Sequence, residues 1–212
     1  NFILFLRSFQ NTPELFLLDK SINKGYLIGD LKLEFDSDGN VKDNYEINGS
    51  IRDAKLSILK KYSFEKLDLI FKYKKDNLFL RDISFSLNDL DFFSKNISLK
   101  KDINNFLING VISHKQLFFD KKNIDLLIKP FFRLVDFKKL RFSSNNNFSF
   151  KINKKFKLDN FTLDSKISID EFLINNELKL KNFFPNVKKN FYFSNHELTV
   201  KYLENNLNVN GK

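Results

Sequence analysis

The sequence predicts a mainly β protein built on a long antiparallel sheet, with one or two short helices. Three observations predict this fold class: apolar and polar residues alternate through most of the 212 residues, short polar turns separate the alternating runs, and helical spacing is confined to short stretches. Because strand side chains point alternately to opposite faces, such a sheet has one apolar and one polar face. The question of function becomes what covers the apolar face.

The first element expected is a β-hairpin within residues 26–57. Asp38-Gly39 supplies a tight turn between two alternating runs. Further strands are expected at 66–73, 78–87, 97–99 and 106–112, and, after Lys138, around 142 and at 148–152, 161–169, 172–180, 191–193 and 198–202. The run Asn145-Asn146-Asn147 is expected to form a loop tip.

A helical interruption is expected near 121–133. Ile124, Leu127, Ile128 and Phe131 follow the i, i+3, i+4, i+7 spacing of a helix, and Pro130 should bend or end it. A second short helix is expected to start at Thr12-Pro13-Glu14, with Thr12 as the cap and Pro13 in the first turn. No linker rich in Pro, Gly or Ser divides the chain, so residues 1–212 are interpreted as a single β-rich segment. We expect it to belong to a longer protein.

An Ile/Val-Asn-Gly sequence occurs three times, ending at Gly49, Gly110 and Gly211. Asn-Gly normally indicates a hairpin turn, but the alternation continues through Gly49 and through Gly110. Glycine inside a strand more often marks a bulge, a bend or a close approach of a neighbour. In a chain rich in Asn, the repeated sequence can also occur by chance.

The composition constrains function without selecting one. The formal charge of +10 is compatible with an anionic partner or with lysines on the polar face that block edge-to-edge aggregation. An AT-rich genome would also account for the many Lys residues and for the 27 Phe residues. The absence of Cys excludes disulfides, thiolate metal sites and a thiol nucleophile. No stretch approaches the roughly 18 apolar residues of a membrane-spanning helix.

Known catalytic and cofactor motifs are absent. His114 and His196 have no metal-ligand spacing around them and are expected on the surface or in loops. The run 36–40 resembles the start of a calcium loop, but its later positions do not fit, and a hairpin turn explains it better. No phosphate-binding Gly-rich loop or nucleophile elbow is present. We therefore expect no enzyme, no cofactor and no metal site.

The candidate functional surface is the apolar face itself. A second sheet closes over such a face as a sandwich, or the sheet curls into a gutter that holds lipid. Nucleic acid is not expected, because the aromatic rings share a face with Leu and Ile rather than with Arg and Lys. The residues expected to line the apolar face are Leu31, Leu33, Phe35, Ile47, Ile51, Leu67, Leu69, Phe71, Ile83, Phe85, Leu87, Phe148, Phe150 and Ile152.

Three stretches resemble the AsmA-like family of Gram-negative envelope proteins. They are residues 29–40 (GDLKLEFDSDGN), residues 47–56 (INGSIRDAKL) and the later run from Phe148 to Ser168. The resemblance implies a curled sheet with an apolar β-groove. It also implies a protein anchored in the inner membrane by parts outside this segment, spanning the periplasm and carrying phospholipid to the outer membrane.

The leading hypothesis is therefore non-enzymatic phospholipid transport between membranes, with lipid acyl chains as the partner in the groove. Two alternatives stay open. In one, the chain is a structural or protein-interaction β-sandwich whose apolar face is its own core. In the other, exposed sheet edges pair with client strands during assembly of outer-membrane proteins.

Overall fold

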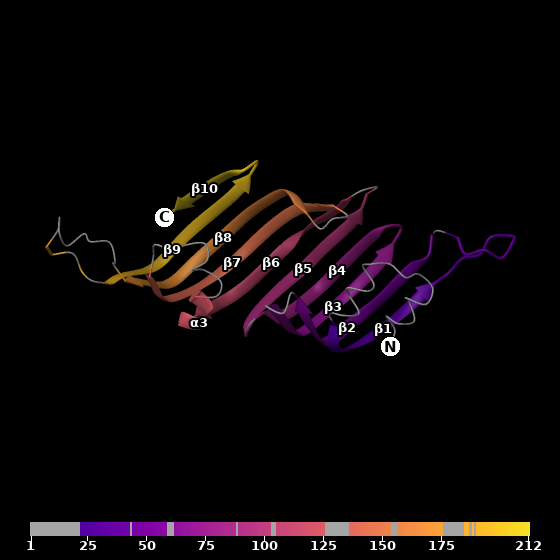
Figure 1. The fold of residues 1–212 in the computed structure, drawn as a ribbon, viewed down its shortest axis with the longest axis horizontal. Coiled ribbons are helices and arrows are strands. Elements are labelled where there is room, and N and C mark those ends of the chain that lie inside the picture. The colour runs from indigo at the N-terminus through magenta and orange to yellow at the C-terminus, as the bar shows by residue number, and fades with distance from the viewer. Residues whose placement is uncertain are drawn as a thin grey trace. The chain divides into compact units, whose positions relative to one another are not determined.

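The computed structural model describes residues 22–42, 44–58, 62–87, 89–102, 105–125, 136–153, 157–175, 185–186, 188 and 190–212. Ten strands account for most of them (Figure 1). Their bounds are β1 (Ile22–Lys32), β2 (Glu46–Ile58), β3 (Tyr62–Lys74), β4 (Asn77–Leu87), β5 (Leu90–Lys101), β6 (Asn105–Phe119), β7 (Asp136–Asn153), β8 (Leu158–Asn175), β9 (Asn190–Leu203) and β10 (Asn206–Gly211).

All ten strands belong to one antiparallel sheet whose order follows the chain from β1 to β10, and the sheet is not closed into a barrel. Each strand thus pairs with the strand that precedes it, and short turns such as those between β3 and β4 and between β9 and β10 favour this pairing. The predicted fold class is confirmed: the protein is mainly β, with almost no helix. The described strands do not form a second sheet.

The chain divides into two compact units. The first contains the described residues up to Ile112 together with Phe148–Phe161, and the second contains Ser113–Asn147 and the described residues from Thr162 onward. In the first unit, β1 to β5 lie side by side in a single layer (Figure 1). The candidate residues named from the sequence all fall in this first unit.

The hairpin expected within 26–57 is confirmed. β1 and β2 pair antiparallel. The described residues within 33–45, which join them, form an arm, and an isolated bridge between Phe35 and Val41 extends the pairing into it. The turn closes where the Gly39 N–H donates to the Asp36 carbonyl oxygen at 3.2 Å. The Asp36 carboxylate also accepts from the backbone N–H groups of Asp38 and Asn40, which is an Asx-type turn.

Several strands run further than the sequence pattern predicts. The expected strand at 97–99 is the second half of β5, and the expected strands at 148–152 and around 142 are parts of one strand, β7. The predicted loop tip at Asn145-Asn146-Asn147 is wrong, because these residues lie inside β7. The Asn146 side chain bonds to serines of its own and a neighbouring strand, and these bonds satisfy it within the sheet.

The predicted helical interruption begins at α3 (Lys121–Asn123). The Asp120 side chain caps this turn by accepting the Asn123 N–H at 2.9 Å. Leu127, Ile128 and Phe131, and the helix expected at Thr12, lie outside the described residues. No helix among the described residues is long and apolar enough to cross a membrane.

Candidate functional site

The apolar face of the first unit is assembled row by row from the strand register. Residues paired across antiparallel strands lie on the same face with their Cβ atoms about 5 Å apart. Two such rows cross strands β1 to β5, and they lie two residues apart along each strand. The first row is Leu31, Ile47, Tyr73, Leu78 and Leu99, and the second is Gly29, Gly49, Phe71, Leu80 and Ile97.

Three bulges keep this face apolar along the strands. Asp53, Lys66 and Asp82 have positive φ angles of 45°, 51° and 49°. Each lies where the register shifts, between Ile51 and Ala54 on β2 and at the corresponding steps of β3 and β4. A bulge adds one residue to a strand, so it reverses the alternation, and apolar residues spaced three apart stay on one face.

Aromatic rings pack together on this face beyond the bulges. Phe85 on β4 lies between Phe64 on β3 and Phe92 on β5, with ring centroids 5.4 Å away on each side. On β7, in the same unit, Phe150 contacts Phe148 and Phe161, at centroid distances of 5.8 and 6.5 Å. Such offset and tilted contacts are the favoured geometries for aromatic pairs.

The apolar face ends in a pair of tyrosines toward the β3–β4 turn. The rings of Tyr45 and Tyr73 lie 5.8 Å apart. Burial, with a hydrogen bond from Tyr45, raises the pKa of the Tyr73 hydroxyl to about 12. The Tyr73 phenol is therefore uncharged at neutral pH, and it offers a polar atom at this end of the face.

The apolar face is neither a sealed core nor a fully exposed surface. Among the described residues no large side chain is fully buried. Leu69 and Ile83 are buried in the middle of the unit, whereas Leu31 and Phe35 are 54% and 57% exposed on the β1–β2 arm. Leu33 is exposed as well, and the half-buried candidates are Ile47, Ile51, Leu67, Phe71, Phe85, Leu87, Phe148, Phe150 and Ile152.

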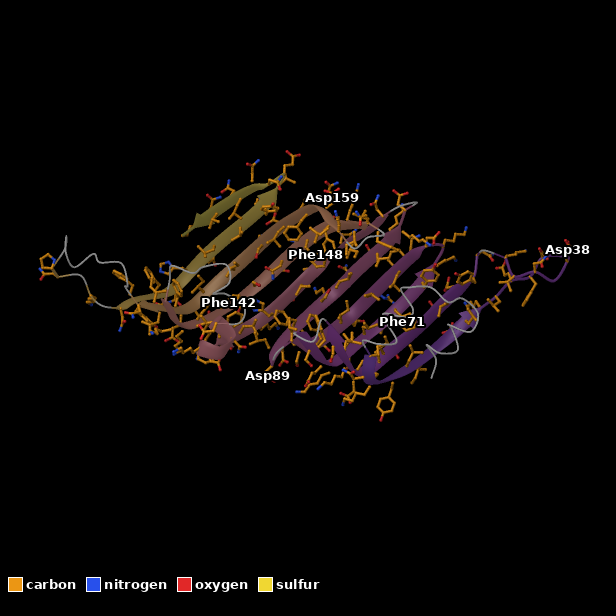
Figure 2. The ribbon with its side chains drawn as sticks, viewed as in Figure 1. Asp38, Phe71, Asp89, Phe142, Phe148 and Asp159 are labelled. Atoms are coloured by element: carbon orange, nitrogen blue, oxygen red, sulfur yellow. The ribbon has the colours of Figure 1, made fainter. Side chains whose placement is uncertain are left out.

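Figure 2 places Phe71 within the strands of the first unit and Asp38 at the tip of the arm. The strand register and the bulges bring the candidate residues of β1 to β4 onto one face. Phe148, Phe150 and Ile152 alternate along β7 in the same unit. Sequence reasoning missed Phe64, Leu78, Leu80, Phe92, Ile97 and Leu99, which belong to the same rows and cluster.

Charged residues lie on the opposite, polar face, where oppositely charged side chains pair across strands. Lys24 pairs with Asp53 at 2.8 Å and Lys55 with Glu65 at 2.5 Å. Glu46 accepts from the Lys72 and Lys74 ammonium groups at 2.8 and 3.2 Å. These contacts, with a bond from Asn48, lower the pKa of the Glu46 carboxyl to about 2.

The second unit holds a buried polar network across β6, β7 and β8. His114 Nε2 and Ser144 Oγ lie 2.7 Å apart, and Ser144 Oγ accepts from the Asn146 amide at 2.7 Å. The Ser165 hydroxyl donates to Asn146 Oδ1. Hydrogen bonds satisfy polar groups that would otherwise be costly to bury, so this network reads as a structural element of the sheet.

The expectation that the histidines lie on the surface or in loops is wrong for His114. His114 is 5% exposed within β6, where its ring edge packs on Phe142 at 4.5 Å, and burial lowers its pKa to about 4. His196 is half-buried within β9, with its ring 5.9 Å from that of Phe193. The alternation contained the signal for His114, since it follows Ile108, Gly110 and Ile112 in step.

The described residues contain no group of three or more His, Cys, Asp or Glu side chains that could hold a metal ion. Comparison with protein-family models, with curated proteins and with solved structures found no match to this chain.

Proposed function

We propose that the apolar face of the first unit binds lipid acyl chains, and that the protein is a non-enzymatic conduit for phospholipid between the inner and outer membranes of the cell envelope. The observation that carries the proposal is a face on which most of the Leu, Ile and Phe side chains are half-buried to exposed, while Leu69 and Ile83 are buried at its middle. The described strands supply no second sheet to cover it.

The energetics favour a continuous apolar surface for such a role. Each acyl CH2 group withdrawn from water gains about 0.8 kcal/mol. A long acyl chain crossing water therefore meets a barrier of roughly ten kcal/mol, which a track of apolar side chains removes without chemistry. The bulges at Asp53, Lys66 and Asp82 serve this role, because without them apolar and charged residues would change places along each strand.

The resemblance to the AsmA-like family supports the proposal from the sequence side. Under it the protein lies in the periplasm, and its contacts with both membranes are made by parts outside this segment. The partners on the apolar face are acyl chains rather than head groups, because the residues of the face carry no charge.

The test is lipid binding and transfer by single-residue variants. Native mass spectrometry of the purified chain is expected to show bound phospholipid, and Phe71→Asp or Phe85→Asp should abolish that binding and the transfer of fluorescent phospholipid between vesicles. A charge placed on the track is costly to cross for an acyl chain. Retained binding and transfer in both variants would overturn the proposal.

Phe93→Asp is the matched control. Phe93 is a 46% exposed phenylalanine on the polar face, opposite Ser84, so its replacement should leave binding and transfer unchanged. Circular dichroism separates the proposal from the closed-sandwich alternative. If Phe71 and Phe85 belonged to a sealed core, both Asp variants would unfold the sheet, since an unpaired buried charge costs several kcal/mol.

A further inference from the structure

An aromatic ring lies among charged and polar side chains on the polar face of the first unit. Phe79 on β4 pairs in register with Lys72 on β3 and with Ser98 on β5, so it shares their face. Its side chain is 46% exposed. The ring is therefore set apart from the rows of Leu, Ile and Phe side chains on the other face.

The guanidinium group of Arg81 lies beside it without a counter-ion among the described residues. Arg81 follows Phe79 on the same face, opposite Asn96 of β5. It forms no ion pair and no side-chain hydrogen bond with any residue that the structure describes, whereas Lys72 is held by Glu46 at 2.8 Å. The bulge at Asp82, with φ 49°, follows directly on β4. Bulges recur beside binding sites because they redirect neighbouring side chains.

Polar side chains complete a shallow depression of about 600 Å³. Within it the Ser98 hydroxyl donates to Asn109 Oδ1 at 2.9 Å. This bond uses the amide oxygen of Asn109 and leaves its two N–H donors for a ligand. The lining residues are Lys72, Phe79, Leu80, Arg81, Asn96, Ile97, Ser98 and Asn109.

We propose that this depression binds a saccharide carrying one anionic group. The ring of Phe79 offers an apolar platform whose negative face attracts the C–H groups of a sugar ring. Arg81 presents a planar fork that matches a phosphate or carboxylate. The amides of Asn96 and Asn109 are placed to bond sugar hydroxyl groups.

Charge and size favour this ligand over a nucleic acid strand. Binding along a nucleic acid backbone requires several uncompensated cations. The depression has two cations, and Lys72 is paired with Glu46, so within the described part of the chain only Arg81 lacks a partner there. Strands are about 4.8 Å apart, so the row from Phe79 through Ser98 to Asn109 spans roughly 10 Å, the size of one or two sugar rings. The site is on the polar face and does not depend on the proposed lipid function.

The test is an NMR titration of the isotopically labelled chain with glucose 6-phosphate, with glucose and inorganic phosphate as separate arms. Amide signals of β4 and β5 around Arg81 and Asn96 should shift. Glucose 6-phosphate should bind at least tenfold more tightly than either fragment, because only it engages both the ring and the guanidinium. Phe79→Ala and Arg81→Gln should each weaken its binding about tenfold.

Phe93→Ala is the control, since Phe93 is equally exposed on the same face, lies opposite Ser84 and does not line the depression; it should bind as the unmodified chain does. The proposal is overturned if no signals shift, if phosphate alone binds as tightly, or if both variants bind like the unmodified chain. Tighter binding of a short oligothymidylate, lost in Phe79→Ala, would replace it with a nucleic-acid site.

Discussion

The ring of Phe71 lies over Gly49 on the neighbouring strand. A Cβ atom at Gly49 would stand 2.6 Å from Cζ of that ring and 2.8 Å from Cε1, closer than carbon atoms approach. The same relationship holds at Gly110, whose Cβ would lie 2.8 Å from Cγ1 of Ile97. Glycine in the repeated Asn-Gly sequence therefore accommodates a side chain of the next strand, as expected for glycine inside a strand.

Replacing Gly49 with alanine should destabilise the protein. The added methyl group must displace the Phe71 ring and also meets the Ile28 carbonyl oxygen, so we expect a loss of about 1–3 kcal/mol in the free energy of unfolding, the usual cost of overpacking. Urea denaturation measures it. In a Phe71→Leu background the penalty should shrink, because the ring contact is gone while the carbonyl contact remains. An undiminished penalty there would mean that the ring is not the obstacle.

The left-handed backbone conformation of Asp53 should make stability sensitive to the residue at this position. A β-branched residue strongly disfavours a φ of 45°, so Asp53→Val should cost about 1–2 kcal/mol, whereas Asp53→Gly should be nearly neutral. Glycine relieves the strain and keeps the N–H that donates to Asp68 Oδ1 at 2.8 Å. Thermal denaturation of both variants gives the comparison.

The ion pair of Asp53 with Lys24 needs its own control, because both Asp53 variants remove it. Its side chains are 59% and 52% exposed, and exposed pairs contribute at most about 1 kcal/mol. Lys24→Gln removes the pair alone and should change stability little. Equal losses in Asp53→Val and Asp53→Gly would contradict the backbone explanation.

The sequence was sufficient for the fold class and for the face of most candidate residues, because alternation depends only on the geometry of a strand. The bulges were not predicted, although apolar spacings of three, from Ile51 to Ala54 and from Leu80 to Ile83, contain their signal. The Asn145–Asn147 loop was predicted wrongly because the composition of a polar run does not reveal its hydrogen bonds. One of those bonds is made with Ser165, which is distant in sequence.

His114 should make the stability of the protein depend on pH. Burial lowers its pKa from 6.5 to about 4, so between these values the unfolded chain binds a proton that the folded chain does not. The free energy of unfolding should therefore fall as the pH drops from 7 to 4, by up to about 3 kcal/mol from this residue. Urea midpoints across that range measure the effect.

The matched variant for this prediction is His114→Gln, which keeps an amide near Ser144 but cannot titrate. It should lose stability at neutral pH and show a smaller decrease from pH 7 to pH 4 than the unmodified chain. Carboxylates also titrate below pH 5, but they do so in both proteins, so the difference between the two curves isolates the histidine. Parallel curves would show that His114 takes up its proton equally in both states.

Glu46 should also make stability depend on pH, but in a lower pH range than His114. Its bonds to Lys72, Asn48 and Lys74 lower its pKa from 4.5 to about 2, so its contribution to stability is fully present above pH 4.5 and is lost as the pH falls through about 2. Glu46→Gln should therefore be less stable than the unmodified chain at pH 7, and the two should converge near pH 2. Chemical denaturation at several pH values measures this difference.

Glu34→Gln is the comparison for Glu46→Gln. The Glu34 carboxylate is 64% exposed and lies 3.9 Å from the Lys42 ammonium group, whereas Glu46 is 13% exposed and contacts two lysines. Solvent screens the exposed pair, so Glu34→Gln should leave the unfolding midpoint nearly unchanged at every pH. If both variants lost the same stability at pH 7, the paired lysines around Glu46 would have no special role, and general charge balance on the polar face would account for both losses.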